Sequence, residues 1–85
     1  MKNRIDDLIE FPTQYIFKII GINTQTFKDN VIQLFHNKKN KTIKFNLSRS
    51  NKYLSVTVEV EILDKEELLE TYDKIKKIEG ITYFL

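Results

Sequence analysis

The sequence predicts one α+β domain with the element order β-α-β-β-α-β, in which both helices cover the same face of a four-stranded antiparallel sheet. Two observations support this prediction. Four segments have the alternation or the β-branched and aromatic composition of strands, and two segments between them have the apolar period that is typical of amphipathic helices. A chain of 85 residues buries only about 60 to 65% of its unfolded surface, which favours a single core with residues 1–12 as an N-terminal extension.

The first strand is expected at about Gln14 to Ile22, where aromatic and β-branched residues are frequent. Pro12 lacks an N–H and therefore fits only the edge or the beginning of a strand. The strand has two faces, which are Tyr15, Phe17 and Ile19 on one side and Ile16, Lys18 and Ile20 on the other. The single lysine indicates that the second face is exposed to solvent.

The segment that follows is expected to form the first helix, because its apolar residues lie on one side of a helix: Phe27, Val31, Leu34 and Phe35. Thr24 or Thr26 is expected to be the N-cap. Thr26 followed by Asp29 three residues later resembles a capping box.

A hairpin is expected next, formed by "TIKFNLS" and "NKYLSVTVEVEI" with the polar turn "SRSN" between them. The second of these strands alternates strictly. Its inward residues are Leu54, Val56, Val58, Val60 and Ile62, and its outward residues are Tyr53, Ser55, Thr57, Glu59 and Glu61. The first and third strands are expected at the centre of the sheet, and the second and fourth at its edges.

The second helix has clear signals at both ends. Asp64 is expected to be the N-cap, Glu67 closes a capping box, and Gly80 follows the last turn. Leu68, Tyr72 and Ile75 form its apolar stripe, and "ITYFL" is the final strand. The resulting arrangement is the ferredoxin-like split βαβ sandwich, a fold that hosts many functions, so function must be argued from sites.

Composition limits the classes of function. Fourteen Lys and Arg against twelve Asp and Glu leave a net charge of +2, which by itself favours no charged partner. The sequence has no cysteine, no apolar run of membrane-spanning length, and two acidic residues where a signal peptide needs apolar ones. We therefore expect a cytoplasmic protein that does not insert in a membrane.

No catalytic, metal or cofactor site is expected. His36 is the only histidine, and no nucleophile or orienting carboxylate accompanies it. Without cysteine, a zinc site would have only carboxylates as further ligands. Glu59 and Glu61 are interpreted as a solvated acidic edge with Lys18 and Lys44 as cross-strand partners.

Basic residues provide the alternative function, electrostatic binding of nucleic acid. Lys38, Lys39, Lys41 and Arg49, with Lys44 and Lys52 nearby, are expected to gather in loops at one end of the domain. RNA-binding proteins of this fold instead place aromatic residues on the outer face of the central strands. The outward positions of the third strand are Ser55, Thr57 and Glu59, so that mode is not predicted.

The outward face of the first strand is the expected contact surface for a partner. Ile16 and Ile20 lie there on either side of Lys18, and two isoleucines on a polar sheet favour protein binding or weak self-association. The N-terminal residues Ile5, Leu8, Ile9 and Phe11 are not assigned to the core, and covering this face is one role open to them.

Two segments, "IEFPTQYIFKIIG" and "SNKYLSVTVEV", resemble the signature segments of the YbeD-like family of small bacterial proteins of unknown function. The match runs from about residue 9 to the C-terminus. Members of that family look like ACT regulatory domains, which implies sensing of an amino acid or another small ligand at the turn after the first strand. That turn reads "GINTQTF" here and lacks the usual acidic motif. Gly21, Asn23 and Thr24 are the positions of this turn that the resemblance assigns to a ligand.

The leading expectation is therefore a bacterial, non-enzymatic regulatory or protein-interaction module with a small effector or a protein as partner. A monomer or a weak homodimer is expected. For Gly21 itself, the alternative to a ligand contact is that the turn requires a glycine.

Overall fold

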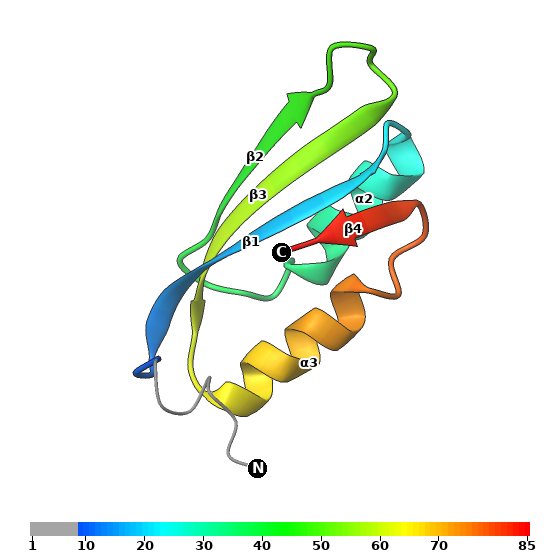
Figure 1. Cartoon of the computed structure of the whole chain (residues 1–85). Helices are drawn as coiled ribbons and strands as arrows, with labels where there is room; N and C mark the ends of the chain where they lie inside the picture. Colours follow the sequence, from blue (N-terminus) through cyan, green and yellow to red (C-terminus); the bar gives the residue numbers. More distant parts are fainter. Residues whose placement is uncertain (1–8) are drawn as a thin grey trace.

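The computed structural model describes residues 9–85, which form a four-stranded antiparallel sheet and two helices (Figure 1). The elements are β1 (Thr13–Ile22), α2 (Gln25–Leu34), β2 (Thr42–Leu47), β3 (Tyr53–Ile62), α3 (Lys65–Ile75) and β4 (Ile81–Phe84). Both helices lie on one side of the sheet. The predicted order and the ferredoxin-like class are confirmed, and Ile5 and Leu8 lie outside the described residues.

The strand order is β2-β3-β1-β4, so β1 and β3 are central and the other two strands are edges, as predicted. In the antiparallel register of β1 and β3, Phe17 lies opposite Val58 and Ile19 opposite Val56. All four side chains are fully buried. The period of two in β3 therefore corresponds to the division between the helix-covered face and the open face of the sheet.

The hydrophobic core lies between the helices and the sheet. Its members come from β1, β3, both helices and the residues just after each helix, and the largest of them are Phe17, Phe27, Phe35, Ile19, Ile62, Leu68 and Ile75. Ile9 and Phe11 pack against this core and are half-buried. The expectation that these two residues stand apart from the core is therefore wrong, because both side chains contribute apolar surface to it.

The helix caps follow the sequence closely. The Thr24 hydroxyl accepts a hydrogen bond of 3.1 Å from the N–H of Phe27, so Thr24 rather than Thr26 is the N-cap of α2. Asp64 caps α3 by accepting a 2.8 Å hydrogen bond from the N–H of Glu67. Gly80 follows α3 with a φ of 90°, a conformation that favours glycine.

An aromatic cluster joins β1 to α3. The hydroxyls of Tyr15 and Tyr72 are 2.9 Å apart, and the Phe17 ring lies against both tyrosine rings. Burial raises the pKa of Tyr72, and the hydrogen bond with Tyr15 raises it further. Tyr72 therefore stays neutral and acts as a packing residue with a satisfied hydroxyl.

Candidate functional site

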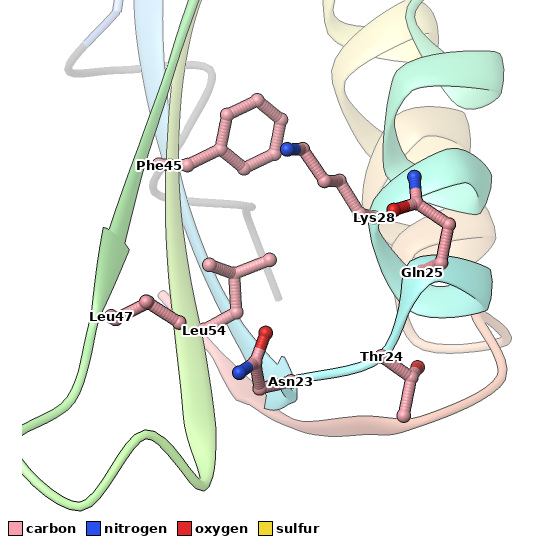
Figure 2. A pocket seen from close by; sticks show the side chains of 7 residues that line it. All are labelled: Asn23, Thr24, Gln25, Lys28, Phe45, Leu47 and Leu54. Atoms are coloured by element: carbon pink, nitrogen blue, oxygen red, sulfur yellow. The ribbon is translucent and has the colours of Figure 1, made fainter.

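A groove opens between the start of α2 and the neighbouring parts of β2 and β3 (Figure 2). Its volume is about 320 Å³, which is within the range of small-molecule sites. Residues of the β1–α2 turn and α2 form one wall, and residues of β2 and β3 form the other: Asn23, Thr24, Gln25 and Lys28, then Phe45, Leu47 and Leu54. The groove thus has a polar wall and an apolar wall.

Lys28 supplies the charge of this groove. Its ammonium nitrogen lies 4.8 Å from the centre of the Phe45 ring, an arrangement that favours the cation over the aromatic face. Among residues 9–85, Lys28 has no carboxylate partner. The first turn of α2 carries no acidic residue, so the positive end of the helix dipole adds to the same field. The groove therefore suits a small molecule that carries a negative charge and an apolar group.

Two of the three residues assigned to a ligand by the family resemblance, Asn23 and Thr24, line the groove, and Gly21 does not. Gly21 is buried, and a Cβ there would lie 2.4 Å from two atoms of the Phe27 ring. Its φ is outside the left-handed region, so the backbone geometry of the turn does not require a glycine here. The close packing of the Phe27 ring against β1 explains it.

The sequence did not identify the rest of the groove. Lys28 lies four residues after Thr24, so helical periodicity alone is enough to place the two side chains near each other. Phe45 and Leu54 come from different strands and reach the groove only through the pairing of β2 with β3 and the packing of α2 on them. No local pattern encodes that neighbourhood.

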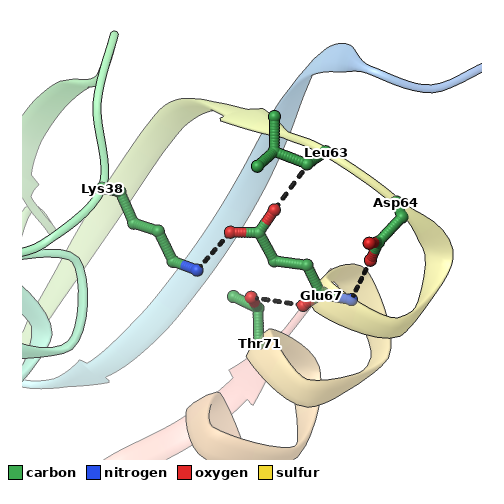
Figure 3. Close-up of polar contacts among 5 residues, drawn as sticks. All are labelled: Lys38, Leu63, Asp64, Glu67 and Thr71. Carbon is green, nitrogen blue, oxygen red and sulfur yellow. Dashed lines mark hydrogen bonds and ion pairs between the residues drawn. The ribbon is translucent and has the colours of Figure 1, made fainter.

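At the other end of α2, Lys38 forms an ion pair with Glu67 (Figure 3). The second oxygen of Glu67 accepts a 2.7 Å hydrogen bond from the N–H of Leu63. Burial tends to raise the pKa of Glu67, but the Leu63 hydrogen bond and Lys38 outweigh this effect and hold the pKa below its usual value. Lys38 therefore links the loop after α2 to the start of α3.

The four basic residues of the nucleic-acid hypothesis do not gather at one end of the domain. Lys38, Lys39 and Lys41 precede β2, whereas Arg49 follows it (Figure 1). The six residues of β2 separate the two groups by roughly 20 Å. Lys41 is also turned toward the backbone, since its ammonium group donates a 2.9 Å hydrogen bond to the carbonyl of Lys38. The expectation of a single basic patch is therefore not met.

Ile16, Lys18 and Ile20 lie on the open face of the sheet, the side away from the helices. Ile16 and Lys18 are exposed and Ile20 is half-buried. Lys18 lies opposite Thr57 in the register, and so does Lys44 from the other side. Within the described part of the chain, neither lysine forms an ion pair with a glutamate, so the expected cross-strand pairs with Glu59 and Glu61 are wrong.

Other chemistry has little support in residues 9–85. His36 is exposed just after α2, and no group of His, Asp and Glu side chains in this range is arranged to hold a metal ion. No helix of this range is both long enough and apolar enough to cross a membrane.

Similarity to known proteins identifies the family of this chain. A family model described as "Protein of unknown function (DUF493)" matches residues 6–85. The chain belongs to this family. A UPF0250 protein of Shewanella halifaxensis is 29% identical over 83 residues, which cover 95% of this chain and 94% of that protein. UPF0250 protein IL0958 of Idiomarina loihiensis is 26% identical over 86 residues, which cover 99% and 98% of the two chains.

Solved structures similar to this DUF493 protein support the fold. Protein HP0495 of Helicobacter pylori has a TM-score of 0.70 at 22% identity and covers 91% of this chain and 85% of its own. The ACT domain from GTP pyrophosphokinase of Chlorobium tepidum has a TM-score of 0.65 at 13% identity and covers 86% and 97%. The predicted resemblance to a bacterial family of unknown function with an ACT-like fold is confirmed.

Proposed function

We propose that this protein is a non-enzymatic regulatory module that binds a small anionic ligand in the groove between α2 and the β2–β3 hairpin. The observation that carries the proposal is the groove itself, in which an ammonium group without a carboxylate partner faces an apolar wall. The similarity to an ACT domain supports a regulatory role. A cytoplasmic location belongs to the proposal and rests on the cysteine-free sequence.

The polar wall explains how a ligand would be oriented. Lys28 provides the counter-charge for a carboxylate, and Asn23 adds a carboxamide at the other end of the groove, beside Leu54 (Figure 2). Asn23 is held in place because its amide donates a 2.9 Å hydrogen bond to the carbonyl of Asn51. Leu54 is buried at 5% exposure and forms the floor on which an apolar side chain would rest. An amino acid with an apolar side chain combines a carboxylate, which Lys28 would bind, with an apolar group, which would rest on Leu54.

Thermal denaturation in the presence of the common amino acids, added one at a time, tests the proposal. We expect at least one amino acid with an apolar side chain to raise the melting temperature with a saturable dependence on concentration, because binding to the folded state stabilises it. Lys28→Ala should abolish this shift, and Lys74→Ala, which changes an exposed lysine of α3, should retain it. No shift with any amino acid, or an equal shift in Lys28→Ala, would contradict the proposal.

A further inference from the structure

The open face of the sheet has an apolar half along β1 and β4. Five of the nine exposed large hydrophobic side chains in residues 9–85 lie on this face, which concentrates them on one side of the molecule. Leu85 belongs to this half because it exchanges backbone hydrogen bonds of 2.8 and 3.3 Å with Lys18 and therefore lies beside it. Four of the five, with the half-buried Ile20, form the apolar half: Ile16, Ile20, Ile22, Tyr83 and Leu85. The fifth exposed side chain, Tyr53, lies opposite Ile22 at the start of β3.

Charged side chains of both signs lie on the same face, in neighbouring rows that run across the strands. Lys18 and Lys44 flank Thr57 in one row, and Glu59 lies in the next row, two residues or about 6.8 Å along β3. Glu59 receives only a long hydrogen bond of 3.5 Å from the amide of Gln14. The described chain therefore leaves complementary charges on this face without an ion pair.

We propose that the open face binds the open face of a second copy of this chain, with a two-fold axis running across the strands. Such an axis keeps β1 opposite β1 and reverses the direction of the strands. The apolar halves then meet, and the lysine row of each copy faces the glutamate row of the other, as a two-fold interface requires. A two-fold axis along the strands would instead place the lysine row of one copy against the lysine row of the other. It would also place the apolar half of one copy against the polar half of the other.

The size of the face indicates the strength of this contact. Strands of ten, ten, six and four residues give a face of roughly 500 Å² for each copy at the usual strand spacing. A total of roughly 1,000 Å² is at the lower end for specific interfaces. We therefore expect a weak, reversible dimer rather than an obligate one, and this inference does not depend on the groove or its ligand.

Sedimentation equilibrium of the full chain from micromolar to millimolar concentration tests the proposal. The wild-type chain should dimerise, and Ile16→Thr with Ile20→Thr should weaken the association constant about tenfold or more while keeping strand propensity. The matched control is Ile32→Thr with Leu69→Thr, which removes two exposed apolar side chains from the helices. The control variant should dimerise like the wild type.

A charge exchange tests the direction of the axis. Lys18→Glu and Glu59→Lys should each weaken the dimer, and the double variant should recover at least part of the association. Circular dichroism confirms that each variant is folded. A wild-type chain that stays monomeric at millimolar concentration would overturn the proposal, and so would a dimer that is insensitive to both sets of variants, since the contact would then lie elsewhere.

Discussion

Glu67 connects three segments of the chain through one carboxylate. It accepts the N–H of Leu63 and pairs with Lys38, and these contacts lower its pKa below the ordinary value of 4.5. Because the folded-state pKa is depressed, the stabilisation is complete above the unfolded value and is lost as pH falls through the folded one. Glu67→Gln should lower the free energy of unfolding at neutral pH by about 1 kcal/mol or less.

Urea denaturation at a series of pH values from about 6 to 3 checks this prediction. The wild-type chain should lose more stability over this range than Glu67→Gln, because the variant lacks the titrating group. Glu79→Gln is the control, since Glu79 is an exposed carboxylate without an ion pair in the described part of the chain, and its pH profile should match that of the wild type. Parallel pH profiles for the wild type and Glu67→Gln would show that the Glu67 contacts do not stabilise the fold.

Gly21 is packed so closely that the structure leaves no room for a Cβ atom at this position. A Cβ at this position meets the Phe27 ring at 2.4 Å and the carbonyl oxygen of Gly80 at 2.7 Å. Gly21→Ala should therefore destabilise the domain by about 1 to 3 kcal/mol through overpacking, measured by chemical denaturation. Adding Phe27→Leu should recover part of the stability, so that the double-mutant cycle shows coupling. Additive effects of the two substitutions would contradict the explanation.

At the level of elements, substitutions at two neighbouring positions of β3 test which face of the sheet is buried. Val58 is fully buried, whereas Thr57 lies on the open face between Lys18 and Lys44. Val58→Asp should destabilise the domain by about 4 kcal/mol or more because it buries an unpaired charge. Thr57→Asp should be tolerated, since both neighbouring lysines favour it. Similar melting temperatures for the two variants in circular dichroism would show that the faces are assigned wrongly.

At the level of the whole molecule, the groove and the open face lie on opposite sides of the sheet. Phe45 and Leu54 point to the helix side, and Ile16 and Lys18 point away from it. The two binding events should therefore be independent. The dimerisation constant of Lys28→Ala should equal that of the wild type in sedimentation, and Ile16→Thr with Ile20→Thr should keep any ligand-dependent rise in melting temperature. A change of either property in the wrong variant would reveal coupling through the sheet.

The sequence by itself determined the elements, their order and most of their ends. The alternation of β3 identifies its buried face and Asp64 marks the start of α3, because these signals depend on residues close together in the chain. The end of α3 at Ile75 lies five residues before Gly80, the glycine that the sequence offers as its stop signal. The order of the elements also predicted that β1 and β3 are central, since few topologies fit that order.

Only the tertiary structure decided which side chains meet. The register of β1 and β3 places Lys18 opposite Thr57 rather than a glutamate, and the length of β2 separates Lys38 from Arg49. The groove exists because α2 packs beside the β2–β3 hairpin and brings Lys28 to Phe45, seventeen positions later in the chain. Periodicity fixes the face on which a side chain lies, but its neighbours across the fold depend on strand register and helix packing, which are properties of the folded chain.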